Sequence, residues 1–226
     1  MAANLPLFPL STVLMPGAPL PLHIFEPRYR QLTVDLVTGA VPDKQFGVIA
    51  VREGWTASDD TATLHRVGCT AELLDVRRLP DGRFDIVTRG CRRFRLLDVD
   101  TEARPYLMAE VEYLPDLPGQ SPDDADDLAV LAGAARAAHR HYCTTAWKNG
   151  DWSEPADDTE PGELPHLLAA DCLLPMSDRQ RLLEQTRPAI RLRMVRALLI
   201  REAGLLGTLH AVPAPLHTFA TDPSPN

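Results

Sequence analysis

Residues 6–30 read PLFPLSTVLMPGAPLPLHIFEPRYR, which is too apolar for a solvated tail and too rich in proline for a helix. Apolar residues fall in three short bursts, residues 5–10, 13–15 and 20–25, and each burst is bounded by proline or glycine. Bursts of this kind are typical of strands joined by tight turns. Met15-Pro-Gly17 predicts such a turn, because proline presets the first corner and glycine permits a positive φ at the second.

The spacing of the apolar residues changes after this region. Pro27 suits the first position of a helix, and Tyr29, Leu32 and Leu36 follow at intervals of three and four. We therefore expect an amphipathic helix that packs back on the strands. Proline cannot donate to a sheet ladder, so the earlier prolines must lie at strand ends, edges or bulges. They are Pro6, Pro9, Pro19 and Pro21.

Further apolar runs predict strands at residues 46–51, 67–76, 84–86, 93–99 and 107–114. Leu79-Pro-Asp-Gly-Arg83 predicts a hairpin turn, in which Asp81 bonds to the backbone and Gly82 takes the left-handed corner. Gly90 is expected to interrupt the following run, and Gly68 to mark a bulge or a close backbone approach. At least six short strands and one helix in the first ~115 residues predict a small, partly closed β-barrel.

The second half of the chain reads as helical. Residues 115–122, PDLPGQSP, predict a linker, and helices are expected from Ser121 to Gly150 and over residues 164–174. A capping box, Ser177-x-x-Gln180, predicts the start of another helix, and Pro188 begins a last one that ends at Gly204. The predicted fold class is α+β, with a barrel over residues 1–117, an α-helical bundle over 118–206 and a disordered tail over 207–226.

The chain resembles the amino-terminal, substrate-binding domain of Lon, the ATP-dependent protease. That family opens with Leu-Pro-Leu-Phe-Pro-Leu, Val-Leu-Met-Pro-Gly and Pro-Leu-His-Ile-Phe-Glu-x-Arg-Tyr, as residues 5–29 do. Residues 68–71 (GCTA), 81–83 (DGR) and 90–94 (GCRRF) continue the match, and 180–184 (QRLLE) and 191–193 (RLR) fit more loosely. The resemblance implies a PUA-like barrel followed by a helical bundle. The family-signature residues, for which we expect structural roles, are Pro16, Gly17, Glu26, Arg28, Tyr29, Asp81, Gly82, Gly90, Arg93 and Phe94.

The resemblance also implies a function in substrate recognition. Full-length Lon joins an unfoldase to a Ser-Lys peptidase, but Lys44 and Lys148, the only lysines, follow no glycine-rich loop and lie in polar contexts. We therefore expect a stand-alone, non-catalytic protein without cofactor or metal, for which a peptidase S16 label would rest on family alone. It would bind unfolded polypeptide or a protein partner linked to protein quality control or proteolysis. The binding groove is expected at the seam between barrel and helices, or at an open strand edge.

Three polar groupings allow other interpretations. On one helix His139 and Cys143 share a face while His141 points elsewhere, but a metal site needs further ligands and none is signalled nearby. We expect solvent-facing histidines beside a buried or half-buried thiol. His23, in an opening strand, is expected to be structural. Glu26 and Arg28 could contact a peptide. We favour a structural role instead, in which Glu26 caps the helix and Arg28 pairs with a nearby carboxylate.

Seven arginines concentrate around the predicted hairpin, which makes a nucleic-acid-binding module the alternative function. They are Arg77, Arg78, Arg83, Arg89, Arg92, Arg93 and Arg95. Interspersed acids and the formal net charge of −8 favour a solvated strand face instead. The acids are Asp75, Asp81, Asp85 and Asp98.

The bulk properties are those of a globular protein. The 226 residues are 45% hydrophobic, and the 4 cysteines form no C-x-x-C pair, so we expect reduced, buried thiols. No basic leader precedes an apolar core, and no apolar run approaches the ~20 residues that cross a bilayer. We expect a soluble, cytoplasmic protein with no membrane contact, and a homo-oligomer stays open.

Overall fold

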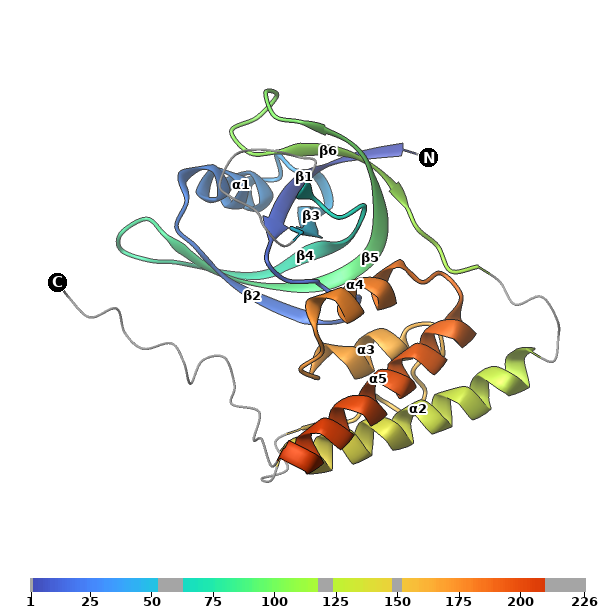
Figure 1. Ribbon diagram of the computed structural model, residues 1–226. Coiled ribbons are helices and arrows are strands. Elements are labelled where there is room, and N and C mark those ends of the chain that lie inside the picture. The colour runs from blue at the N-terminus through green and yellow to red at the C-terminus, as the bar shows by residue number, and fades with distance from the viewer. Residues whose placement is uncertain (1, 53–62, 118–123, 148–151, 210–226) are drawn as a thin grey trace.

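The computed structural model describes residues 2–52, 63–117, 124–147 and 152–209 (Figure 1). It is a mixed α+β fold with one sheet of six strands among these residues. The strands are β1 (Ala2–Leu10), β2 (Pro19–Ile24), β3 (Gln45–Ala50), β4 (Val67–Arg78), β5 (Phe84–Asp100) and β6 (Met108–Tyr113). The helices are α1 (Pro27–Thr38), α2 (Asp124–Ala146), α3 (Leu164–Ala170), α4 (Met176–Glu184), α5 (Pro188–Leu209) and the short 3-10 helix η1 (Pro42–Lys44).

The sheet closes on itself through its longest strand. The strand order is β2-β5-β4-β3-β1-β6, and β6 pairs again with β5. β5 pairs with β2 over Phe84–Arg89 and with β6 over Phe94–Asp100, and a register shift between Leu96 and Asp98 breaks the second ladder. Five strands therefore form a ring of pairings, and β2 lies outside it as an edge strand. The pairing of β1 with β3 is parallel and the others are antiparallel.

Both turns predicted from proline and glycine are confirmed. Gly17 has a φ of 78°, and the Ala18 N–H donates to the Met15 carbonyl at 3.1 Å. Gly82 has a φ of 81°, and the hairpin turn from residue 79 to 83 is bonded at both ends. Asp81 Oδ1 accepts the N–H of Arg83 at 3.1 Å, so the aspartate bonds to the backbone as expected.

Two strand predictions are wrong. Residues 13–15 are buried but belong to no strand, and Gly90 does not interrupt the sheet, because β5 runs through it. A Cβ atom at Gly90 would lie 2.2 Å from the Met15 carbonyl oxygen, and the Gly17 N–H donates to the Gly90 carbonyl at 2.8 Å. Glycine is therefore required here by the close approach of two backbones, and not because the strand ends.

Prolines occur where one side of a strand has no ladder. Pro19 and Pro21 lie on the edge strand β2. In β1 the residues up to Pro6 pair with β6, whereas Leu7–Leu10 pair with β3, so Pro9 follows the point where one partner strand is exchanged for the other. The expected positions at strand ends, edges or bulges therefore hold for Pro19 and Pro21, whereas Pro6 and Pro9 lie within β1, an inner strand of the sheet.

The core has two parts. One cluster gathers around Phe94 from alternate residues of β1, β3 and β6, such as Leu5, Leu7, Ile49 and Val111, as the two-residue period of a strand requires. The other cluster joins the remaining sheet surface to the helices. In α1, Pro27 lies in the first turn, and the residues at positions 29, 32 and 36 are buried as predicted.

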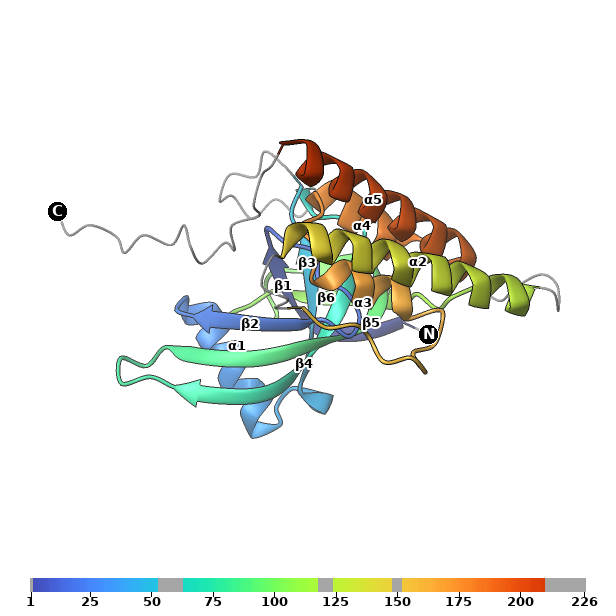
Figure 2. The same cartoon turned by 90° about the horizontal axis from the view of Figure 1, so that it is seen from below.

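The four later helices form a layer on one side of the sheet, with α1 on the opposite side (Figure 2). α2 packs against α5, while α3 and α4 lie between that pair and the sheet (Figure 1). Two boundary predictions are wrong: α5 continues past Gly204 to Leu209, and Ser177 lies inside α4, whose N-cap position is Pro175 without a side-chain bond. Among the described residues, no helix has the length and apolar character needed to cross a membrane.

Candidate functional site

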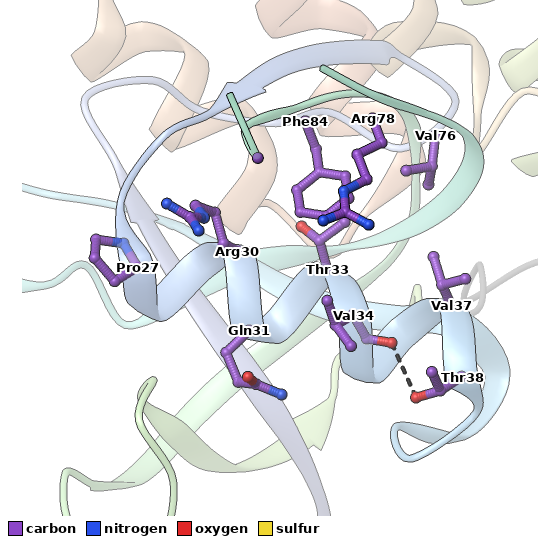
Figure 3. A pocket seen from close by; sticks show the side chains of 11 residues that line it. Pro27, Arg30, Gln31, Thr33, Val34, Val37, Thr38, Val76, Arg78 and Phe84 are labelled. Atoms are coloured by element: carbon purple, nitrogen blue, oxygen red, sulfur yellow. Dashed lines mark hydrogen bonds between the residues drawn. The ribbon is translucent and has the colours of Figure 1, made fainter. Parts of the chain in front are cut away.

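A groove of about 520 Å³ runs between α1 and the hairpin that connects β4 to β5 (Figure 3). We refer to it as the α1–hairpin groove. Val76 and Phe84 point from the hairpin toward α1, and Val37 points back toward them (Figure 3). The lining residues are Pro27, Arg30, Gln31, Thr33, Val34, Val37 and Thr38 from α1, and Val76, Arg78, Gly82 and Phe84 from the hairpin.

The apolar strip of this groove comes from the side of α1 that does not face the core. Leu32 and Leu36 are buried against the sheet, whereas the side chains of Val34 and Val37 are 40% and 53% exposed. Two valines three positions apart lie next to each other on a helix surface, so they form one apolar strip. No sequence motif marked these two valines as functional, although the helix phase already places both of them outside the buried face.

Two arginines line the groove, one from each wall. Among the described residues, neither Arg30 nor Arg78 forms an ion pair or a side-chain hydrogen bond. The Arg30 guanidinium lies beside the hairpin turn, where its Nη2 is 3.4 Å from the position of a Cβ at Gly82. The α1–hairpin groove thus offers apolar surface together with two positive charges whose donors are available to a ligand.

The neighbouring arginines of the hairpin are instead neutralised within the sheet. Arg77 pairs with Asp85 at 2.5 Å, and Arg83 pairs with Asp81 at 2.5 Å. The pKa of Asp81 is lowered first by the hydrogen bond from the Arg83 backbone N–H and then by the Arg83 guanidinium, and the pKa of Asp85 is lowered by hydrogen bonds from Arg77 and His23. Further pairs join Arg89 to Glu72 and Arg95 to Glu112. The acidic partners thus cancel most of the basic concentration on which a nucleic-acid interface would depend.

The open edge of the sheet is poorly suited to strand addition. β2 pairs on one side with β5 and on the other with no described strand. Pro19 and Pro21 on this edge have no N–H, so β2 offers fewer donors to a peptide lying along it. At the far end, His23 Nδ1 lies 2.7 Å from Asp85 Oδ1, which places His23 in a surface contact with a neighbouring strand.

The seam between sheet and helices is held by charged groups that already have partners. Arg93 of β5 and Arg191 of α5 both bond to the carboxylate of Asp116, with Arg191 Nη2 2.6 Å from Oδ2. Arg93 also donates to the carbonyls of Leu183 and Gln185 at 2.9 and 2.7 Å. We call Asp116, Arg93 and Arg191 the Asp116 junction. It lines a pocket of about 430 Å³, so a cavity does occur at the seam, but its charges are used in holding the two layers together.

Burial governs protonation around the Asp116 junction. His166 is buried, and its pKa lies well below 6.5 because of desolvation and the positive charges of Arg191 and Arg93. Desolvation and the nearby Arg191 likewise lower the pKa of Arg93. His166 is therefore a neutral imidazole beside two cations at neutral pH.

The other family-signature residues lie in separate structural contacts. Pro16 and Gly17 form the turn whose backbone bonds to Gly90, and Phe94 lies at the centre of the core cluster that β1, β3 and β6 share. Arg28 Nε donates to Glu26 Oε2 at 2.9 Å, and Glu26 takes the N-cap position of α1 without a side-chain capping bond. The expected pairing of Arg28 with a nearby carboxylate is therefore made with Glu26. The expected cap of α1 by the Glu26 side chain is not formed. The ring of Tyr29 stacks on the ring of Phe8, with their centroids 3.8 Å apart.

The histidines of α2 differ from the sequence prediction. His141 is exposed, but His139 is only 1% exposed and faces the interior of the helical layer. It lies beside Cys143 and, unexpectedly, beside Cys172, which follows α3. Hydrogen bonds with Cys172 and His139 lower the pKa of Cys143 to about 6. The tertiary structure therefore brings a third side chain of metal-binding type to the pair, which the sequence did not signal.

Comparison with known proteins places this geometry in a family. The family model of the ATP-dependent protease La (LON) substrate-binding domain matches residues 4–201. The chain belongs to the Lon substrate-binding domain family. The match covers the sheet, the α1–hairpin groove, the Asp116 junction and most of the helical layer.

Relatives of known sequence include Lon proteases of bacteria. The Lon protease of Anaeromyxobacter dehalogenans (strain 2CP-C) is 30% identical over 207 residues, which are 90% of this chain and 24% of that protein. Lon protease 2 of Myxococcus xanthus is 29% identical over 205 residues, 89% of this chain and 24% of that protein. The chain thus spans about a quarter of the length of these curated Lon relatives.

Solved structures of Lon domains have the same fold. The Lon N-terminal domain protein from Xanthomonas campestris is 26% identical, with a TM-score of 0.61, over 86% of this chain and 98% of that one. The N-terminal domain of the Mycobacterium avium complex Lon protease is 20% identical, with a TM-score of 0.63 over 87% and 98% of the two chains, and shows the likeness of fold alone.

Proposed function

We propose that this chain binds extended segments of polypeptide in the α1–hairpin groove and releases them unchanged. Membership of the Lon substrate-binding domain family supports a role in substrate binding. The observation that carries the choice of site is the combination of exposed valines with two arginines that have no described acidic partner. Apolar side chains of a segment would cover Val34 and Val37, which would remove exposed apolar surface from water.

The charge of the groove specifies its occupant further. Arg30 and Arg78 present donors on opposite walls, so the preferred segment carries an acidic side chain or a free carboxylate near its apolar residues. The groove lies on the α1 side of the sheet, away from the helical layer (Figure 2). Binding there would leave the Asp116 junction intact. A link to proteolysis is part of the proposal, because the relatives are named as Lon proteases.

The proposal includes two finer points. We infer that the ring of pairings β5-β4-β3-β1-β6 is a small, partly closed barrel of PUA-like type, a reading that the return of β6 to β5 supports. We also propose that the chain has no hydrolytic activity of its own. Incubation of the purified chain with an unstructured peptide, followed by mass spectrometry, is expected to return the peptide intact; cleavage would contradict this point.

The binding experiment uses fluorescence anisotropy with a labelled peptide of alternating leucine and serine that contains two glutamates. Val37→Asp and Arg78→Ala are each expected to weaken binding about tenfold, equivalent to about 1.4 kcal/mol. Both side chains lie at the surface, so the variants should fold, as circular dichroism will check.

Two matched controls separate the groove from general surface effects. Val130→Asp changes a 72% exposed valine of α2, and Arg77→Ala changes the arginine next to Arg78, which projects to the other face of the strand. Both controls should bind like the parent chain. Equal loss in Val130→Asp and Val37→Asp would refute the assignment of the groove. An RNA oligonucleotide in place of the peptide is expected to give no salt-sensitive binding, and salt-sensitive binding that falls in Arg92→Ala would favour the nucleic-acid alternative instead.

A further inference from the structure

The helical layer holds a buried cluster of three side chains with the chemistry of metal ligands. His139 and Cys143 lie one turn apart on α2, and Cys172 comes from the segment that follows α3. All three are at most 1% exposed. Nothing in the proposed binding function uses them, because the α1–hairpin groove is on the opposite side of the sheet (Figure 2).

The spacing of the ligand atoms suits one small cation. The imidazole nitrogen and the two sulfurs all lie within 4.8 Å of one another, and His139 Nε2 is 3.4 Å from Cys143 Sγ. A tetrahedral Zn²⁺ with bonds of about 2.3 Å to sulfur and about 2.0 Å to nitrogen separates a sulfur from a nitrogen ligand by about 3.5 Å. The three side chains therefore need only small adjustments to share an ion.

The histidine is also poorly satisfied without one. Among the described residues its buried Nδ1 has no hydrogen-bond partner, and the hydrogen-bonding contact of its Nε2 is with the thiol of Cys143. A thiol is a weak hydrogen-bonding group, so the ring is buried with little compensation for lost water. A bond from Nε2 to a metal would supply the strong partner that the imidazole lacks.

The surroundings fix two of the three ligand positions. The Tyr142 hydroxyl accepts the Leu173 N–H at 3.0 Å, which ties the segment after α3 to α2 beside Cys172. The ring of Trp152 packs edge-on against His139, with centroids 5.9 Å apart. A cation here would join α2 to the end of α3, where the Tyr142 bond already links the two elements.

We propose that His139, Cys143 and Cys172 form a Zn²⁺ site that cross-links α2 to the end of α3, with water as the fourth ligand. Thiolate and imidazole ligands favour Zn²⁺ or Cu⁺ over the oxygen-seeking Mg²⁺ and Ca²⁺. Two thiolates and one neutral imidazole cancel the charge of Zn²⁺, whereas they leave a net negative charge around Cu⁺. The neutral assembly is less costly to bury in an apolar layer, which selects Zn²⁺.

The test is a metal titration of the purified, tag-free chain, kept reduced and stripped with a chelator. After ZnCl₂ addition and gel filtration, elemental analysis should find about one Zn²⁺ per chain. With CoCl₂ in place of ZnCl₂, the chain should show thiolate-to-cobalt charge-transfer absorption together with the visible bands of four-coordinate Co²⁺. The cobalt spectrum is read on the unmodified chain, so it decides the question even where a variant does not fold.

Variants assign the ligands. Cys143→Ser, Cys172→Ser and His139→Gln should each reduce retained Zn²⁺ by about tenfold or more and remove the cobalt spectrum. The controls are His141→Gln, which changes the exposed histidine of the same helix, and Cys69→Ser, which changes a buried thiol in β4; both should keep one ion. The proposal is overturned if the parent chain retains no Zn²⁺ or if its cobalt spectrum lacks the thiolate band.

Discussion

Replacing Asp116 by asparagine tests how the helical layer is attached to the sheet. The change keeps the shape of the side chain but removes the negative charge on which Arg93 and Arg191 converge. Both arginines are at least 94% buried, so water compensates only in part for the lost carboxylate around them. The amide nitrogen of asparagine would also point a donor at a guanidinium, which has donors only.

The magnitude follows from the contacts. One guanidinium–carboxylate pair is worth about 4 kcal/mol at an effective dielectric constant of about 20, and breaking a buried pair costs about 3–5 kcal/mol. The side chain of Asp116 is 33% exposed, so solvent already weakens its two interactions. We therefore expect Asp116→Asn to lower the free energy of unfolding by about 3 kcal/mol, the lower end of that range.

The assay is urea unfolding followed by circular dichroism and by tryptophan fluorescence. Trp147 and Trp152 are half-buried in the helical layer and report on its packing. With a slope of about 2–3 kcal/mol per molar urea, the midpoint should fall by about 1 M or slightly more. If the Asp116 junction is what makes the two layers unfold together, the two probes should also separate in Asp116→Asn.

The matched control is Asp85→Asn, which removes a surface aspartate that bonds to Arg77 and His23. Exposed ion pairs add little to stability, so its urea midpoint should stay close to that of the parent chain. Equal midpoints for Asp116→Asn and Asp85→Asn would refute the reasoning, because a buried junction would then contribute no more than a surface pair.

Three other predictions concern backbone fit and protonation. Gly90→Ala should destabilise the fold by about 3 kcal/mol, since its Cβ would lie 2.2 Å from a backbone oxygen; a change below 1 kcal/mol by urea titration would contradict this. Gly133→Ala, in α2 with nothing within 4 Å of the new Cβ, should instead stabilise by about 0.5–1 kcal/mol in the same titration. Because the pKa of buried His166 lies well below its unfolded value of 6.5, the unfolded chain binds the extra proton, and stability should fall below about pH 6.5 by up to about 1.4 kcal/mol per pH unit. His166→Gln should flatten this slope in thermal unfolding between about pH 7 and pH 5, and an unchanged slope would exclude His166 as its source.

Local chemistry made much of the fold predictable. The turns at Gly17 and Gly82 follow from residues that permit a positive φ, and α1 follows from Pro27 and the spacing of its buried side chains. These signals act within a few residues, so they need no knowledge of distant segments. The order of the motifs also indicated the family, which the match over residues 4–201 confirms.

Local signals misled where a distant segment sets the requirement. Gly90 resembled a break because glycine weakens a strand, but it is needed because the turn after Met15 crosses β5 there. Gln180 resembled part of a capping box, but its amide donates to the Val67 carbonyl of β4 at 3.0 Å. A glycine or a glutamine can be required by a neighbouring residue or by a distant segment, and a single sequence does not distinguish the two cases.

The sites divide in the same way. The sequence by itself determined the outward position of Val34 and Val37 on α1, because helix phase is a local property. Only the tertiary structure set the hairpin opposite them to make a groove, and only it brought Cys172 to His139 and Cys143. The physical reason is that a helix fixes neighbours three or four residues apart, whereas contacts between elements depend on how whole layers pack.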